Sequence, residues 1–195
     1  MEKGLAIITG ADGGMGQVIT AALAKEGYPV IMACLDPEKA ASLCNRIQQE
    51  TGNTQIEVRR IDLASLSSVN NFTGQLLKEG RPVSRLMNNA GILTTPVRKT
   101  EDGLETIVSV NYVAPYMLTR QLLPLMQPGC RIVNTVSCTY AIGRIEPDFF
   151  EKGRNGRFFR IPVYSNTKLA LLLFTQELAE RLQNQGITIN ASDPG

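Results

Sequence analysis

A tyrosine and a lysine stand four residues apart, at Tyr164 and Lys168, within a stretch that contains no Gly or Pro before Gly186. If this stretch is helical, the two side chains lie on one face, roughly 5–6 Å apart at Cβ. A phenol has an ordinary pKa of about 10, and a nearby ammonium favours its ionised form. The pair could therefore act as a general acid and base. Taken alone, a Tyr and a Lys at this spacing are usually a solvated helix surface, so the other residues of the chain must decide.

The composition limits the chemistry that the chain can perform. It has 195 residues, 43% hydrophobic and 19% charged, with a formal net charge of +2, which indicates one globular domain and no attraction to nucleic acid or membranes. It has no His, and its four Cys lack metal-ligand spacing. We therefore expect no metal site and no Ser–His or Cys–His nucleophile. With no apolar run of about 18 residues and a strand already beginning near Leu5, we expect no membrane span, no signal peptide and a cytoplasmic location.

Six short apolar runs alternate with helical patterns and predict the elements that position these residues. The strands are expected over 4–9, 29–34, 56–61, 83–87, 131–136 and 187–191. The helices are expected to end near 27, 50 and 79, with a long helix over 103–126 that Pro115 bends and another that begins near Tyr164. This alternation predicts an α/β fold of Rossmann type. Its parallel sheet is doubly wound in the order 3-2-1-4-5-6, with helices on both faces.

Glycine-rich and polar segments follow the predicted strand ends, where ligands bind in such sheets. The loop from Gly10 to Gly16 separates the first strand from a helix, a layout that brings backbone N–H groups against a phosphate. A plain turn would also explain this loop alone. The other polar groups at strand ends are Asp62, Asn89, Ser137 and Pro194-Gly195.

Together these residues resemble the short-chain dehydrogenase/reductase family over essentially the whole chain. The matching motifs are Thr9-Gly10 with Gly14-Met15-Gly16 (TGxxxGxG), Asp62-Leu63, Asn88-Asn89-Ala90-Gly91 (NNAG) and the tetrad Asn111, Ser137, Tyr164 and Lys168. The sequence that follows Lys168 and the wide gap between Ser137 and Tyr164 also resemble the retinol dehydrogenase-like and protochlorophyllide reductase-like branches.

The resemblance implies an NAD(P)-dependent oxidoreductase that interconverts an alcohol and a carbonyl by hydride transfer. Tyr164 would be the general acid or base, and Lys168 would lower its pKa and hold the nicotinamide ribose. Ser137 would hydrogen-bond the substrate oxygen, and Asn111 would position a water in a proton relay. The residues implied in cofactor binding are Gly10, Asp12, Gly13, Gly14, Met15, Gly16, Leu35, Asp36, Asp62, Leu63, Asn89, Ala90, Gly91, Tyr164, Lys168, Pro194 and Gly195. Asn88 and Asn89 are also expected to tie strand ends together.

The residues leave NAD and NADP both open. Retinol dehydrogenase-like members commonly carry an Arg where this chain has Leu35, and that Arg would bind a 2′-phosphate. Here Asp12 and Asp36 place two carboxylates nearby without an evident cation. These charges favour NAD, whereas the resemblance to that branch favours NADP.

The segment 139–161 is a basic and aromatic insertion in the single domain predicted over 1–195. Asn155-Gly156 predicts a turn of a small hairpin within it. One interpretation makes the segment a substrate wall or lid that favours an apolar or anionic substrate; the alternative is a surface insertion that packs its Phe residues and solvates its Arg residues. The residues in question are Arg144, Lys152, Arg154, Arg157, Arg160, Phe149, Phe150, Phe158 and Phe159.

Family members normally continue beyond the position of Pro194-Gly195 into a substrate-binding loop, a further helix and a seventh strand. We therefore expect a fragment that lacks this C-terminal part. The resemblance also implies a homodimer or homotetramer that pairs through the helices starting near 103 and 164.

A cofactor-binding sensor or scaffold of the same fold is the main alternative function. A methyltransferase would share the glycine loop but would have no reason for the tetrad.

Overall fold

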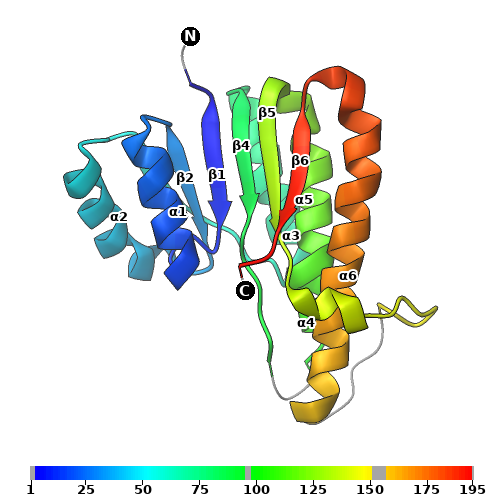
Figure 1. Cartoon of the computed structure of the whole chain (residues 1–195). Coiled ribbons are helices and arrows are strands. Elements are labelled where there is room, and N and C mark those ends of the chain that lie inside the picture. The colour runs from blue at the N-terminus through cyan, green and yellow to red at the C-terminus, as the bar shows by residue number, and fades with distance from the viewer. Residues whose placement is uncertain (1–2, 95–97, 151–156, 195) are drawn as a thin grey trace.

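The computed structural model describes residues 3–94, 98–150 and 157–194, without the side chains of 157–159, and shows one parallel sheet. Its strands lie in the order β3-β2-β1-β4-β5-β6 (Figure 1), which confirms the predicted order. The strands are β1 (Leu5–Thr9), β2 (Val30–Cys34), β3 (Ile56–Arg60), β4 (Val83–Asn88), β5 (Met126–Thr135) and β6 (Thr188–Ser192).

Helices cover both faces of the sheet, as predicted. The helices α1 (Gly14–Lys25) and α2 (Pro37–Thr51) lie on one face, and α3 (Leu66–Glu79), α5 (Ala114–Leu122) and α6 (Arg157–Leu182) lie on the other (Figure 1). Alternate residues of a strand face opposite sides of a sheet, so Ile7 joins the apolar cluster under α3, α5 and α6. Its neighbours Ala6 and Ile8 join the cluster under α1 and α2.

The single helix predicted over 103–126 is divided in the structure. It consists of α4 (Thr106–Val108), a π-helical turn (Ser109–Val113), α5 and a 3₁₀ turn (Leu123–Leu125). Pro115 has no N–H to donate to the carbonyl of Asn111, so the interruption lies directly before it, where the sequence predicted a bend. The strand β5 begins at Met126 rather than 131, because Met126 pairs with Val83 beyond a register shift.

The helix α6 begins at Arg157, two turns before the position expected from the sequence. Pro162 lies inside it and is exposed. Tyr164 therefore lies within α6 rather than at its start. The hairpin predicted at Asn155-Gly156 falls outside the described residues.

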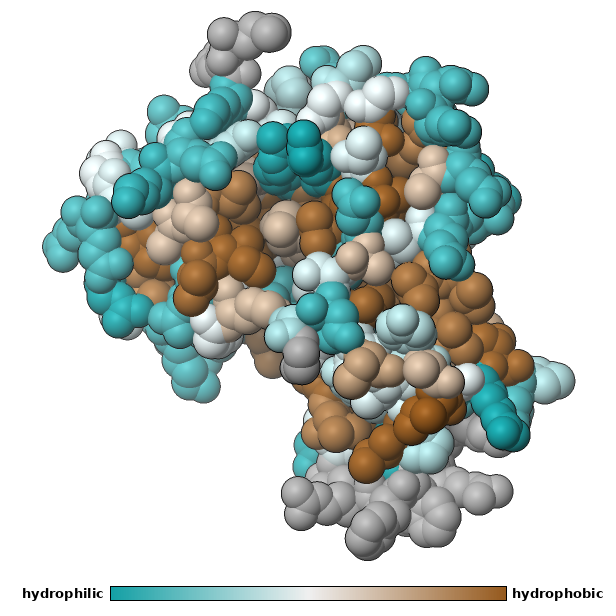
Figure 2. Space-filling model, in the orientation of Figure 1, coloured by the Kyte–Doolittle hydropathy of each residue, from teal (hydrophilic) through white to brown (hydrophobic). Residues whose placement is uncertain are grey.

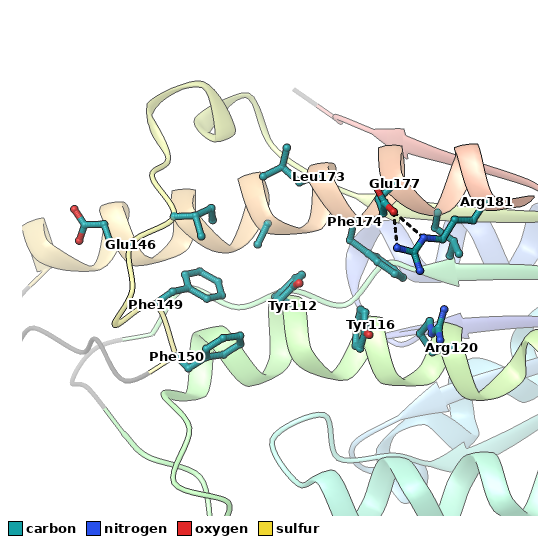
Figure 3. Close-up of a pocket in the computed structure, with 13 residues that line it drawn as sticks. Tyr112, Tyr116, Arg120, Glu146, Phe149, Phe150, Leu173, Phe174, Glu177 and Arg181 are labelled. Carbon is teal, nitrogen blue, oxygen red and sulfur yellow. Dashed lines mark hydrogen bonds and ion pairs between the residues drawn. The ribbon is translucent and has the colours of Figure 1, made fainter.

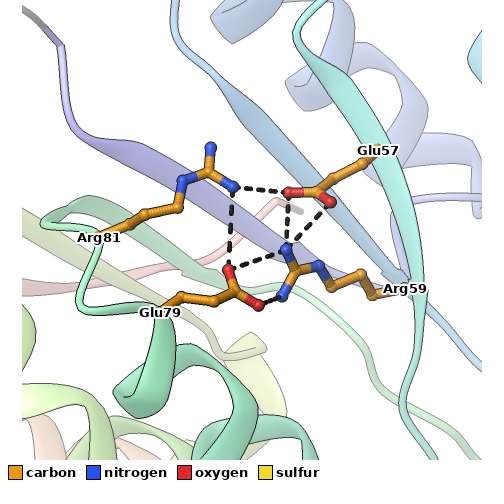
Figure 4. Close-up of polar contacts among 4 residues, drawn as sticks. All are labelled: Glu57, Arg59, Glu79 and Arg81. Carbon is orange, nitrogen blue, oxygen red and sulfur yellow. Dashed lines mark hydrogen bonds and ion pairs between the residues drawn. The ribbon is translucent and has the colours of Figure 1, made fainter.

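An ion-pair network fastens the end of α3 to the edge strand β3 (Figure 4). The Arg59 Nη1 atom lies 2.6 Å from Glu79 Oε1, and Arg81 Nη1 lies 2.9 Å from Glu57 Oε1. The guanidinium of Arg59 holds the pKa of the Glu79 carboxyl below its usual range. Charged side chains along an edge strand also oppose pairing with another sheet.

No helix in the described ranges is both long and apolar enough to cross a membrane. In the same residues, no three His, Cys, Asp or Glu side chains are grouped so that they could hold a metal ion.

Candidate active site

The glycine loop links the carboxyl end of β1 to the start of α1 and is shaped by contacts that exclude larger residues. Gly10 has a φ of 60°, a conformation that L side chains rarely adopt. A Cβ on Gly16 would lie 2.1 Å from the Gly10 carbonyl oxygen, so no other residue fits there. The N-cap of α1, Gly13, offers no capping side chain, and no acidic residue stands in the first turn. The uncapped N–H groups and the helix dipole suit the pyrophosphate of a dinucleotide.

The Asn-Asn-Ala-Gly segment after β4 holds this loop in place. The Asn89 Nδ2 atom donates to the carbonyl oxygens of Thr9 (3.0 Å) and Gly10 (3.3 Å). The Thr9 hydroxyl in turn accepts from the backbone N–H groups of Asn89 and Ala90, at 3.0 and 3.1 Å. A Cβ on Gly10 would lie only 3.1 Å from the Ala90 Cβ, so the two loops touch.

Asn88 is buried and links neighbouring elements, as the sequence suggested. Its Nδ2 atom donates to Thr119 Oγ1 (2.9 Å) and to Asn134 Oδ1 (2.7 Å). The Asn134 Nδ2 atom then donates to Thr175 Oγ1 at 2.9 Å. This chain of bonds connects β4, β5, α5 and α6 beneath the site.

Asn111 lies at the centre of the π-helical turn and is fully buried. Its Oδ1 atom accepts from the Ile92 N–H (2.8 Å), and its Nδ2 atom donates to the Ile92 carbonyl (2.9 Å). A longer contact of 3.4 Å joins Nδ2 to Thr167 Oγ1 on α6. Asn111 therefore fixes the segment after Gly91 beside α6. The water relay that the resemblance implies for this residue stays a prediction.

Lys168 is 2% exposed and points from α6 toward the carboxyl end of β5. Its Nζ atom donates to the Thr135 carbonyl at 2.7 Å and lies 5.4 Å from the centre of the Tyr164 ring. A Cβ on Gly91 would lie 3.3 Å from Nζ, so the NNAG segment approaches the ammonium closely. Burial lowers the pKa of Lys168 to about 8.

Tyr164 is partly buried, and burial raises the pKa of its phenol. A hydrogen bond with Ser137 opposes this increase, while the charge of Asp193 and the neighbouring Cys138 add to it. Loss of water around the phenol is the largest influence on this pKa. The Lys168 Nζ atom lies 5.4 Å from the ring centre, and the lowering of the pKa that the resemblance implies for Lys168 stays a prediction.

Ser137 follows β5 and caps a 3₁₀ helix over Cys138–Ile142. Its Oγ atom accepts from the Thr139 N–H at 3.4 Å and contacts the Thr139 hydroxyl at 3.2 Å, besides its bond with Tyr164. The structure thus brings Ser137, Tyr164 and Lys168 together, with Asn111 one contact away. Asp193, just after β6, is a further neighbour of this group, which the sequence analysis passed over in favour of the adjacent Pro194-Gly195.

The other predicted cofactor residues follow the ends of β2, β3 and β6. Asp62 accepts from the Ala64 N–H at 2.9 Å, and Leu63 is buried. Leu35 is 59% exposed after β2, beside Asp36, which caps α2. Pro194 is exposed, and Gly195 falls outside the described residues.

Asp12 and Lys39 define the charges near the end of β2. Burial, and then the negative charge of Asp12, raise the pKa of the Cys34 thiol to about 12, which places that carboxylate beside β2. Lys39 Nζ lies 2.8 Å from the Asp36 carboxylate, so the expectation that no cation stands nearby is wrong. The two residues are three apart at the start of α2, a spacing that brings side chains together on a helix.

A groove of about 460 Å³ lies between α5, α6 and the segment after the 3₁₀ helix (Figure 3). None of the residues predicted for catalysis or cofactor binding lines it. Phe149 is buried there, with its ring 5.6 Å from that of Tyr112. This contact favours the packing interpretation of that part of the insertion. Pairing of two chains through the helices around this groove stays a prediction.

Arg160 does not fit the interpretation of the insertion as an anion-binding wall. Its side chain is fully buried and forms an ion pair with Glu105, so it cannot meet an anionic substrate. Apolar side chains are instead exposed around the start of α6, where Figure 2 shows brown surface in the lower part of the molecule. These residues are Leu93 (54% exposed), Ile142 (67%), Ile145 (48%) and Ile161 (43%).

Comparison with known proteins gives the family. The model of the short chain dehydrogenase family matches residues 4–147. Human retinol dehydrogenase 13 is 37% identical over 191 residues, and mouse retinol dehydrogenase 12 is 38% identical over 191 residues. Each match covers 97% of this chain but only 57% and 60% of the relative, so the chain spans about three fifths of their length. These relatives confirm the predicted resemblance to the retinol dehydrogenase-like branch.

Solved structures agree with this result. An uncharacterised protein from Mycobacterium paratuberculosis superposes with a TM-score of 0.84 at 36% identity, over 100% of this chain and 69% of that protein. A metagenomic blue fluorescent protein in complex with NADPH superposes with a TM-score of 0.79 at 28% identity, over 100% of this chain and 74% of its own. With a family match over most of its residues and the expected strand order, the chain belongs to the short-chain dehydrogenase family.

Proposed function

We propose that the chain carries the nicotinamide site and the catalytic residues of an NAD(P)-dependent oxidoreductase that interconverts an alcohol and a carbonyl. The observation that carries this proposal is the arrangement of Tyr164, Ser137 and buried Lys168 around one point at the carboxyl edge of the sheet. The glycine loop with its uncapped helix start lies at the same edge. The family membership and the names of the relatives support this assignment.

Each residue has a role that follows from its surroundings. A bound nicotinamide supplies the hydride chemistry. Tyr164 gives its phenolic proton to the substrate oxygen, since burial keeps the phenol protonated at neutral pH. Ser137, already bonded to that phenol, donates to the same oxygen and stabilises its developing charge. Lys168 holds the ribose hydroxyls, and Asn111 keeps the Gly91 segment against it.

The substrate class that we propose is an apolar alcohol or carbonyl compound. The exposed apolar residues around the start of α6 lie beside the segments that carry Ser137 and Gly91. Burial of Arg160 removes one cation that an acidic substrate would need. The relatives named as retinol dehydrogenases act, by those names, on an apolar alcohol.

Fluorescence titration with NADH and NADPH, followed by turnover with neutral apolar and acidic aldehydes, tests this function. We expect binding of at least one cofactor and faster reduction of the apolar aldehydes. Binding without turnover of any carbonyl or alcohol would favour the sensor alternative, and the absence of binding would contradict the proposal.

For the cofactor we propose NAD, because Asp12 and Asp36 offer carboxylates where a 2′-phosphate would lie and position 35 carries Leu. Lys39, a cation near this position, is paired with Asp36. The complex of the blue fluorescent protein with NADPH supports the alternative.

Substitution of Leu35→Arg is expected to tighten NADPH binding about tenfold and leave NADH binding almost unchanged. A guanidinium at this exposed position would pair with a 2′-phosphate, which NADH lacks. Dissociation constants from the fluorescence titrations measure the effect, and Leu35→Gln serves as a neutral control of similar length. Tighter binding of NADPH than of NADH by the unsubstituted chain would show that the NAD assignment is wrong.

A further inference from the structure

A fully buried ion pair joins the first turns of α6 to the start of α4. Arg160 and Glu105 are each fully buried, and an Arg160 Nη2 atom donates to Glu105 Oε1. The Arg160 Nε atom also donates to the Thr94 carbonyl at 2.7 Å. Glu105 uses its second oxygen to accept from the Val108 N–H at 3.0 Å, which caps α4.

The pair connects three segments that carry the candidate site. Arg160 stands one helical turn before Tyr164 and two turns before Lys168 on α6. Thr94 ends the described part of the segment that begins at Gly91, which approaches Lys168 Nζ. Glu105 begins the helical run that contains Asn111.

Two fastenings therefore hold the same three segments together. Asn111 binds both backbone groups of Ile92 at the inner end, close to Lys168. The Arg160–Glu105 pair binds the outer end through Thr94. Between them Tyr164 packs on a small apolar cluster, formed by Ile107, Val108, Phe149, Val163 and Ala170, that is separate from the main core. Further along α6, Leu171, Phe174, Leu178 and Leu182 pack in the main core, so the ion pair acts on the first turns of the helix.

Stability alone is a poor reason to bury such a pair. The free-energy cost of removing two charges from water often equals or exceeds the gain from their attraction. Apolar residues of similar volume would therefore commonly stabilise the fold to the same degree. The charged pair adds orientational specificity, because the planar guanidinium of Arg donates hydrogen bonds to its acceptors in a fixed geometry. Here that guanidinium meets one carboxylate and one carbonyl from different segments.

We propose that Arg160 and Glu105 are positioning residues, which set the placement of Tyr164 and Lys168 against the Gly91–Thr94 segment. The expected effect on kcat rests on the proposed function. The position of Tyr164 can be followed without turnover, through the pH at which its phenol titrates. A pair that only stabilises the fold would affect folding and leave the site unchanged once the protein is folded.

The test compares three forms of the full chain. Arg160→Met/Glu105→Gln removes both charges and keeps an oxygen to cap Val108, so no buried charge is left unpaired. Arg160→Lys keeps the charge but cannot reach Thr94 and Glu105 together as a fork. Arg59→Met/Glu79→Gln removes an ion pair of the network at the edge of the sheet, away from the site, and is the matched control.

Three quantities are measured on each folded form: the dissociation constant for NADH or NADPH, kcat and KM for an apolar aldehyde, and the titration midpoint of Tyr164. The absorbance of phenolate in the ultraviolet is followed against pH for each form and for the same form carrying Tyr164→Phe. The difference between the two curves gives the titration of Tyr164. For Arg160→Met/Glu105→Gln we expect kcat to fall about tenfold or more, with KM and cofactor affinity within about threefold. We also expect the Tyr164 midpoint to move by about half a pH unit or more. Arg160→Lys should recover part of kcat.

An unchanged kcat and Tyr164 midpoint in the double variant would overturn the proposal, as would an equal loss of kcat in the control. Should the double variant fail to fold, the same readouts on Arg160→Lys decide the question. Should the unsubstituted chain show no turnover, the proposed function fails, and the Tyr164 midpoint alone then supports or overturns the positioning role.

Discussion

Replacing Tyr164 by Phe is expected to lower kcat for carbonyl reduction by about 10²–10⁴-fold while leaving the fold and cofactor affinity nearly unchanged. The substitution removes only the hydroxyl, and the ring keeps its packing against the cluster around Val163. Steady-state kinetics and cofactor fluorescence measure the two effects separately. A loss confined to kcat indicates a group that acts during the chemical step.

The matched control for this substitution is Tyr116→Phe. Tyr116 lies on α5 in the outer groove, where its ring stands 5.0 Å from that of Phe174. Removing its hydroxyl should leave kcat within about twofold. If Tyr164→Phe retained the turnover of the unsubstituted chain, Tyr164 would not be the proton donor and the proposed mechanism would fail.

The pH dependence of the same reaction follows from the direction in which burial moves the pKa of Tyr164. Because that pKa is raised, the phenol stays protonated through neutral pH. Reduction, which needs the proton, should therefore hold its rate to higher pH than an exposed tyrosine would allow. Alcohol oxidation needs the phenolate and should accelerate as the pH rises.

The sequence predicted the residues of this site because each depends on local chemistry at a strand end. Gly10 and Gly16 are required by backbone conformation and by close approach, both of which a glycine loop after a strand implies. Ser137 and Asn89 follow buried strands, and parallel strands bring their carboxyl ends to one edge. The fold, and the grouping of these residues at one edge of the sheet, were thus readable from the order of motifs.

The pKa of Tyr164 and the Arg160–Glu105 ion pair were not predictable in this way. The pKa of Tyr164 depends on how much water the fold removes, which no spacing encodes. Arg160 looked like one of several solvated cations, since its partner Glu105 lies 55 residues away. The early start of α6 was hidden by Pro162, which usually marks a helix start, although the contacts of Arg160 fasten the turn before it.

The second large effect is expected for Lys168→Met, which should stabilise the folded chain at pH 7 while impairing its function. The ammonium is 2% exposed, and burial lowers its pKa from 10.5 to about 8. A shift of this size means that keeping Lys168 charged lowers the unfolding free energy of the unsubstituted protein by about 3 kcal/mol below pH 8. Met removes that cost but leaves the Thr135 carbonyl without its donor, which costs about 1 kcal/mol. The net gain should be about 2 kcal/mol.

The dependence of this gain on pH identifies its cause. Between about pH 8 and 10.5 the unfolded chain binds the lysine proton and the folded chain does not, so the stability of the unsubstituted protein rises with pH. The difference between the two proteins should therefore shrink through that window, while the contributions of other groups cancel. Urea unfolding at pH 7, 8.5 and 10 measures it, and exposed Lys78→Met serves as the control that shows no such trend.

Function should change in the opposite direction to stability. Without the ammonium that we propose to hold the ribose, cofactor affinity is expected to fall about tenfold, and kcat with it. A residue that destabilises the fold yet supports binding and turnover is kept for its chemistry rather than for packing. A Lys168→Met protein that is less stable at pH 7, or whose gain is the same at pH 7 and 10, would show that Lys168 is not a buried ammonium. The electrostatic basis of the proposed site would then be wrong.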